Sequence, residues 1–145
     1  MSYVSIRAAI KTKLDALVVA TTLGCVFNGE QPPQAVEIPA WPAAELTRIQ
    51  TTPEYFTNRE DMQWYVFLIN LYQQIEETNT GTVEVAMDAV VDAVMQKFLD
   101  DVSLSGVLDG RLQPVENQAS VVAWMGRQCR RDQIMLRCPK IKAMP

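Results

Sequence analysis

The sequence predicts one α+β domain spanning residues 1–145, with a mostly antiparallel sheet, an N-terminal helix and a second helix packed on it. Two segments have the apolar spacing of amphipathic helices, and the segments between and after them have the composition of strands. Short turns join these strands, which favours antiparallel pairing. A chain of 145 residues has the size of one ordinary domain and buries roughly two thirds of its unfolded surface.

The first predicted helix runs from about Val4 to Val19. Arg7, Lys11 and Asp15 recur at four-residue spacing on its expected solvent face. The expected buried face consists of apolar residues three or four positions apart, namely Ile6, Ala9, Ile10, Leu14, Leu17 and Val18.

Three elements are expected next. Residues 25–28 read as a short strand, and a proline-rich loop separates them from a second strand at Ala43 to Ile49, whose start the prolines keep out of a sheet interior. The polar segment from Thr51 to Asp61 is predicted to be an exposed loop, with Tyr55 and Phe56 as an aromatic contact.

The segment MQWYVFLINLYQQI, residues 62–75, is predicted to be a long strand with two apolar faces. A strand with one face in water alternates apolar and polar residues, so the second face is either covered within the fold or closed by a partner. We expect Phe67 and Ile69 to face the helices. One face carries Tyr65, Phe67, Ile69, Leu71 and Ile75, and the other carries Trp64, Val66, Leu68 and Tyr72, interrupted by Asn70.

The second helix is predicted from about Val83 to Leu99, with Thr82 as its N-cap after a turn at 76–81. Its expected apolar face comprises Val83, Ala86, Met87, Val90, Val91, Val94, Met95 and Phe98, and its polar stripe comprises Glu84, Asp88, Asp92, Gln96 and Asp100. Within it, the acidic residues Glu84, Asp88 and Asp92 are interpreted either as a solvated face or as a docking surface for basic residues of a partner.

Two further strands are expected, from Gln113 to Met125 and from Arg131 to Cys138. Arg127, Arg130 and Arg131 would then lie in or beside the turn between these strands. They are interpreted either as soluble turn residues or as a grip on phosphate or an acidic partner.

The composition argues against most enzyme classes. The chain has no histidine, which excludes Ser-His-Asp and Cys-His nucleophile systems and removes the commonest transition-metal ligand. No Gly-rich phosphate loop is present, and a net charge of −4 gives no electrostatic reason to expect nucleic acid as a direct ligand. We therefore expect no catalytic residues, no cofactor and no metal. Two sets of acidic residues are expected to be solvated. Asp100, Asp101 and Asp109 could otherwise be considered as metal ligands, and Glu76 and Glu77 as an acid–base pair.

Cys25, Cys129 and Cys138 are odd in number and form no CxxC motif, so free thiols in a reducing compartment are expected. Charged residues interrupt the apolar residues near the amino terminus, which predicts neither a signal peptide nor a membrane span. We expect synthesis in the cytoplasm and no membrane partner.

Three stretches resemble, in order and length, the elements of one protein family: NREDMQWYVFLINLYQQIE, TVEVAMDAVVDAVMQKFLDDVSLSGVLDGRLQPVE and RRDQIMLRCPKI. The succession is similar to the tail terminator proteins of long-tailed double-stranded DNA bacteriophages, also called minor tail or tail-completion proteins. Shared features are an aromatic strand preceded by an arginine, a helix like AVVDAVMQKF, the turn at Leu104, Ser105 and Gly106, and an opening helix like IRAAIKTKL. The resemblance covers about residues 4–141.

The resemblance implies a structural virion protein of the tail or neck, assembled in the host cytoplasm. Such proteins form a hexameric ring on the head-proximal end of the tail tube, end tube polymerisation and join the head connector or stopper protein. The implied partners are further copies of the chain, the tail tube protein and the head connector or stopper. Candidate contacts with the tube are Tyr55, Phe56 and Arg59, and candidate contacts between subunits are Asp88, Asp92, Arg127, Arg130 and Arg131.

Two other interpretations stay open. Another phage neck component, such as a head-completion or stopper protein, would share the size, the acidity and the lack of catalytic motifs. A small enzyme or ligand-binding α+β domain would need polar groups converging in an apolar cleft, for which Trp64 and Trp124 are the candidate lining.

Overall fold

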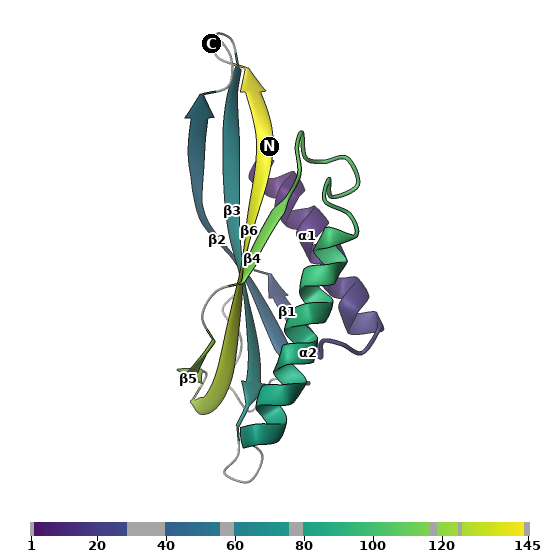
Figure 1. Cartoon of the computed structure of the whole chain (residues 1–145), viewed down its shortest axis with the longest axis vertical. Helices are drawn as coiled ribbons and strands as arrows, with labels where there is room; N and C mark the ends of the chain where they lie inside the picture. The colour runs from purple at the N-terminus through teal and green to yellow at the C-terminus, as the bar shows by residue number, and fades with distance from the viewer. Residues whose placement is uncertain are drawn as a thin grey trace.

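The computed structural model describes residues 2–28, 40–55, 60–75, 80–116, 119–124 and 126–143. These residues form two helices and a six-stranded sheet, which confirms the α+β class and the expected order of helix, strands, helix, strands. Both helices lie to one side of the sheet (Figure 1). The elements are α1 (Ser2–Val19), β1 (Cys25–Asn28), β2 (Ala43–Tyr55), β3 (Glu60–Gln74), α2 (Thr80–Leu99), β4 (Gln113–Glu116), β5 (Ser120–Trp124) and β6 (Arg127–Ala143).

The strand order is β1-β2-β3-β6-β4, with β5 also paired to β6. All pairs are antiparallel except β1 with β2. β3 and β6 pair along their whole common length, from Glu60 opposite Ala143 to Gln74 opposite Cys129, so the long apolar strand is central in the sheet. The ends of β2, β3 and β6 extend past the helices (Figure 1).

The main core lies between the helices and one face of the sheet. Phe67 and Ile69 are fully buried there, as predicted. Ala86 was expected in the buried face of α2 but is exposed, because the buried stripe follows the narrower i, i+4, i+8 spacing. The core includes Ile6, Ile10, Leu14 and Leu17 of α1, Val83, Met87, Val91, Val94 and Phe98 of α2, and Leu46, Leu71, Ile134, Leu136 and Cys138 of the sheet.

The predicted exposed loop from Thr51 to Asp61 is wrong for most of its length. β2 continues to Tyr55, and β3 begins at Glu60, with Thr51 opposite Tyr65. Backbone pairing with β3 satisfies the groups on one edge of this polar segment and holds it as a strand. Residues 56–59, which include Phe56 and Arg59, lie outside the described residues.

Two predicted boundaries in the second half are also corrected. α2 begins at Thr80, so Thr82 lies in the first turn of the helix and does not cap it. The predicted strand from Gln113 to Met125 is two strands. Glu116 pairs with Ile134 but Ser120 with Arg131, so the registers of β4 and β5 along β6 differ by one residue.

The last strand is longer than predicted, because β6 starts at Arg127. Arg127, Arg130 and Arg131 therefore lie within a strand and not in a turn. The hairpin turns between Trp124 and Arg127, where Gly126 has φ +79°, a conformation that glycine adopts without strain and that permits a very short turn.

Candidate interaction surfaces

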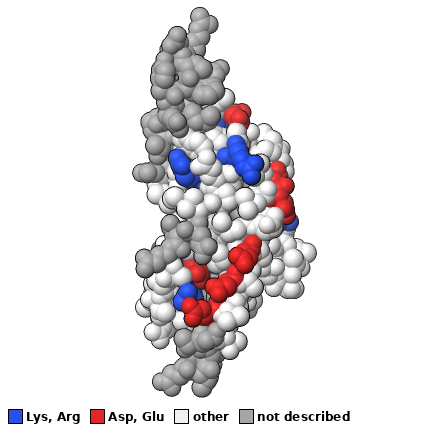
Figure 2. Space-filling view, in the orientation of Figure 1, with Lys and Arg blue, Asp and Glu red and all other residues white. Residues whose placement is uncertain are grey.

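An acidic stripe, defined here as Glu84, Asp88 and Asp92, lies along the outer side of α2. All three side chains are exposed, as predicted. Figure 2 shows acidic side chains as a band across the lower half of the molecule. Val85 is 71% exposed and shares a side of the helix with Asp88 and Asp92. The stripe therefore combines three carboxylates with an exposed apolar side chain.

Arg130 is engaged by its own chain. Its guanidinium lies 3.7 Å from the carboxylate of Glu84 on α2 and 3.8 Å from that of Asp132. Asp132 is buried, so Arg130 places a positive charge beside a carboxylate that lies away from water. The predicted pairing of Arg130 with Asp88 and Asp92 of a neighbouring subunit stays a prediction.

Arg127 and Arg131 lie on the opposite face of β6 from Arg130, because side chains alternate along a strand. Nη1 of Arg127 donates to Oε1 of Gln74 at 2.9 Å, and Nη2 of Arg131 donates to Oγ of Ser120 at 3.4 Å. The three arginines therefore do not form a single basic patch. The roles of Arg127 and Arg131 in contacts between subunits also stay predictions.

Of the three candidate residues for tube contact, the structure describes only the backbone of Tyr55. Tyr55 is the last residue of β2 and pairs with Asp61 near the start of β3. Phe56 and Arg59 belong to the connection that joins these two strands. The contact of Tyr55, Phe56 and Arg59 with a tube therefore stays a prediction.

The second face of the sheet, opposite the helices, carries a polar ladder across three strands. Nδ2 of Asn70 on β3 donates to Oε1 of Glu45 on β2 at 3.2 Å, and Nε2 of Gln133 on β6 donates to Oδ1 of Asn70 at 2.9 Å. Asn70 is the residue that interrupts the apolar run of the long strand, and it is buried. Its hydrogen bonds satisfy the buried amide and favour this register of the strands.

An aromatic cluster closes the second face beside this ladder. The rings of Trp124 and Tyr72 stack with centroids 4.0 Å apart, and Trp41 and Phe27 meet Trp124 edge-on at 5.9 and 6.4 Å. Burial, with the nearby carboxylate of Glu45 acting in the same direction, raises the pKa of Tyr72 to about 12. This part of the face is closed by the chain's own residues.

Farther along the second face lies an open row, defined here as Trp64, Leu68, Met135, Arg137 and Val115. The first three side chains are half-buried, and Val115 is 40% exposed. Cζ of Arg137 lies 4.6 Å from the Trp64 ring centroid. Because the helices pack on the other face, the open row leaves apolar surface available, which is typical of an interaction site.

The sequence suggested that Trp64 and Trp124 line one pocket, but the two side chains lie far apart in the sheet. Their register partners on β6 are Pro139 and Arg127, which lie near opposite ends of that strand. The two tryptophans therefore cannot line one cleft.

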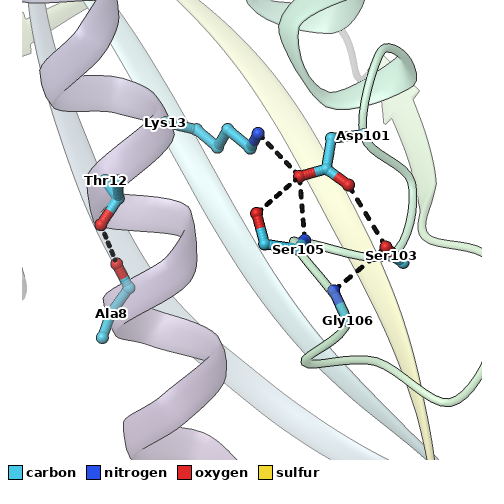
Figure 3. A network of polar contacts seen from close by, with 7 residues as sticks. All are labelled: Ala8, Thr12, Lys13, Asp101, Ser103, Ser105 and Gly106. Carbon is cyan, nitrogen blue, oxygen red and sulfur yellow. Dashed lines mark hydrogen bonds and ion pairs between the residues drawn. The ribbon is translucent and has the colours of Figure 1, made fainter.

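A polar network joins α1 to the segment after α2 (Figure 3). Nζ of Lys13 lies 2.8 Å from Oδ2 of Asp101, which also accepts hydrogen bonds from the backbone N–H of Ser105 at 2.9 Å and its hydroxyl at 3.0 Å. The Ser103 hydroxyl donates to Oδ1 of Asp101 and accepts from the N–H of Gly106. The network holds a turn in which Ser105 and Gly106 have positive φ.

Asp101→Asn should lower the melting temperature at pH 7. Hydrogen bonds from Lys13 and from the Ser105 backbone hold the pKa of the Asp101 carboxyl well below its usual range. A carboxyl with a lowered folded pKa stabilises the fold above its unfolded pKa, about 4, and loses that contribution as pH falls through the folded pKa. Melts at several pH values should show the gap to wild type narrowing below about pH 4. Asp100→Asn is the exposed control, and a gap that widens on acidification would contradict the interpretation.

A second basic feature, the arginine hollow, was missed by the sequence reasoning. It is a depression of about 360 Å³ lined by Tyr3, Val4, Arg7, Ala8, Asn28 and Arg48. Nη1 of Arg7 donates to Oδ1 of Asn28 at 3.1 Å and to the Leu46 carbonyl at 3.4 Å, and Cζ of Arg48 lies 4.5 Å from the Tyr3 ring centroid. Arg7 was expected on the solvent face, but its Cζ lies 5.4 Å from the buried Phe67 ring centroid, so it is partly covered. No local pattern links Arg7 with Arg48, since only the packing of α1 on β2 brings them together.

The described residues contain no group of three or more Cys, Asp or Glu side chains arranged to hold a metal ion. Asp101 binds Lys13, and Asp109 accepts the N–H of Ile141 at 2.8 Å. Glu76 and Glu77 lie outside the described residues.

The three cysteines are free thiols, with Cys129 and Cys138 buried and Cys25 half-buried. Burial raises the pKa of each thiol, that of Cys138 to about 12, which makes them poor nucleophiles. Neither described helix is long and apolar enough to cross a membrane.

Comparison with protein-family models and with curated proteins finds no match. Among solved structures, one chain of the "Virion of native gene transfer agent (GTA) particle" is similar, with 16% identity and a TM-score of 0.49. The alignment covers 92% of this chain and 93% of that chain. Similarity at this level does not establish a shared function.

Proposed function

We propose that this chain is a structural virion protein of a phage tail or neck. In this proposal it forms a ring on the head-proximal end of the tail tube, ends tube polymerisation and provides the surface that joins the head. Its partners are further copies of itself, the tail tube protein and the head connector or stopper protein. The sequence resemblance to tail terminators supports the specific role, and the surfaces of the fold support a role in assembly.

The open row is the observation that carries the proposal. Trp64, Leu68 and Met135 lie on the two longest strands of the sheet, on the face opposite both helices. A binding site for a small molecule is concave and encloses its ligand, whereas this row follows the face of a sheet. A partner with a matching apolar face would bury the row, so the geometry suits a subunit contact better than catalysis.

The sheet edges favour a ring over an open assembly. β1 pairs with β2 only as far as Leu46, so the outer edge of β2 from Thr47 to Tyr55 has no strand partner among the described residues. Open edges and apolar faces promote uncontrolled association unless a closed arrangement limits it. Cyclic symmetry provides such closure with a fixed number of copies.

The purified protein should form a species near six times 16.3 kDa, about 98 kDa, at high concentration or when mixed with tail tubes. Light scattering over a concentration series measures the mass, and negative-stain images should show rings with a central hole. Val115→Glu, which places a charge in the open row, should weaken assembly while the fold remains intact. Val121→Glu is the matched control, because Val121 is 50% exposed on β5 and lies outside the open row. A dimer or tetramer that persists under all conditions would count against the ring.

A further inference from the structure

We infer that neighbouring subunits bind each other through the arginine hollow of one chain and the acidic stripe of the next. The existence of a ring is taken from the proposed function. The inference adds which residues form the contact between neighbouring subunits of that ring. The occupant of the hollow is a second copy of this chain, chosen because the charges of the two surfaces are complementary.

The hollow carries two guanidinium groups, those of Arg7 and Arg48, that form no ion pair within the part of the chain that the structure describes. The hydrogen bonds of Arg7 to Asn28 and Leu46 both use one nitrogen, Nη1, and both end on neutral oxygens. Arg48 is exposed, and its guanidinium lies over the Tyr3 ring, which positions it without removing its charge. Two oriented guanidinium groups in one depression can bind carboxylates.

The acidic stripe supplies exposed carboxylates that could pair with the guanidinium groups of the hollow. Asp88 and Asp92 lie one helical turn apart on α2, are exposed, and have no ion-pair partner among the described residues. Glu84 is partly used by Arg130 of the same chain. Two carboxylates on α2 and two guanidinium groups in the hollow are therefore without an ion-pair partner among the described residues.

The two surfaces lie on opposite flanks of the subunit. The hollow is built from α1, β1 and β2, at one edge of the strand order, whereas α2 packs on β3, β6 and β4, toward the other edge. A head-to-tail interface requires two different surfaces on opposite flanks, and repetition of that interface by rotation closes a ring. Charges of opposite sign on the two flanks favour this arrangement over a symmetric dimer, in which like surfaces would meet.

Exposed apolar side chains accompany the charges on both flanks. Val4 in the hollow is 63% exposed, and Ile49, next to Arg48, is 46% exposed. Val85 beside Asp88 is 71% exposed. Burial of these side chains between subunits would add apolar contact to the charge pairs, as in ordinary protein interfaces.

Charge reversal tests the pairing. Arg48→Glu alone and Asp88→Lys with Asp92→Lys should each raise the concentration needed for half-assembly by about tenfold or more, because each places like charges in contact. A mixture of the two variants should recover assembly, since a ring with an even number of subunits can alternate them and keep opposite charges at every interface. The triple variant Arg48→Glu/Asp88→Lys/Asp92→Lys should also assemble by itself. Sedimentation velocity measures the extent of assembly. Melting temperatures equal to that of wild type show that each variant is folded.

Matched variants control for net charge. Arg111→Glu changes an exposed arginine outside the hollow, and Asp15→Lys with Asp100→Lys changes two exposed carboxylates outside the stripe. Both controls should assemble like wild type. Wild-type assembly should also weaken as salt rises from about 0.05 to 0.5 M, because partly exposed charge pairs are screened.

The possible failures are distinguishable. Wild-type-like assembly by either reversed variant, or a mixture that fails to recover, overturns the pairing and leaves the ring and its function in place. A wild-type protein that never self-associates overturns both. Charge-dependent rings from a protein whose loss does not affect phage tails support the pairing and overturn the proposed function.

Discussion

Replacing Phe67 by alanine should destabilise the fold by about 3 to 5 kcal/mol, because it removes a fully buried ring and leaves a cavity. Tyr3 contacts this ring edge-on at 5.9 Å between centroids, and the guanidinium of Arg7 lies over it. The substitution therefore loosens α1 as well as β3. For a domain of this size the melting temperature should fall by roughly 10 to 20 °C.

Leu68→Ala is the matched control for Phe67→Ala. Leu68 is the next residue of the same strand, but it faces away from the helices and is half-buried. Leu68→Ala should lower the free energy of unfolding by less than half as much as Phe67→Ala, because it removes less buried apolar area and leaves a smaller cavity. Denaturant titrations of the two variants give the free energies of unfolding. Equal losses would show that the helix face is not the main core.

If the chain is a tail terminator, as proposed, inactivation of its gene should leave DNA-filled heads and separate tails, many of abnormal length. Without a cap, tube subunits lack the signal that stops polymerisation, and heads lack the surface on which they dock. Electron microscopy of infected lysates checks both effects, and added purified protein should restore joining to tails of normal length. Tails of normal length joined to heads in the inactivated phage would refute the terminator role.

The same complementation assay tests the candidate tube contact. Tyr55→Ala with Phe56→Ala should keep the fold but fail to restore head joining, since aromatic side chains are effective interface anchors. A circular dichroism melt controls for folding. Full activity of this variant would reject Tyr55 and Phe56 as the tube contact without affecting the terminator role.

The helices and the core could be predicted because their signals are local. The period of apolar residues placed α1 within two residues of its observed bounds and identified Phe67 and Ile69 as core. The exposed acidic stripe follows from the same periodicity.

The extent of the hairpin and the arginine hollow could not be predicted in this way. The outer half of β2 is polar, so its local sequence resembles that of a loop. It is a strand because its backbone pairs with β3, and the local pattern of side chains does not indicate such pairing. Arg7 and Arg48 are far apart in the sequence, and their proximity depends on how a helix rests on an edge strand. Both features therefore require the tertiary structure.

The register of β2 with β3 shifts between Arg48 and Gln50, which is a β-bulge at Ile49. Beyond the bulge, the outer edge of the strand has no partner among the described residues, and edges of this kind can pair with strands of other chains and start aggregation. A bulge increases the local twist and breaks the even spacing of donors and acceptors, and Pro53 removes another donor from the same strand. In a protein proposed to stop the growth of the tail tube, the bulge and Pro53 thus both oppose growth of an aggregate from its own edge strand.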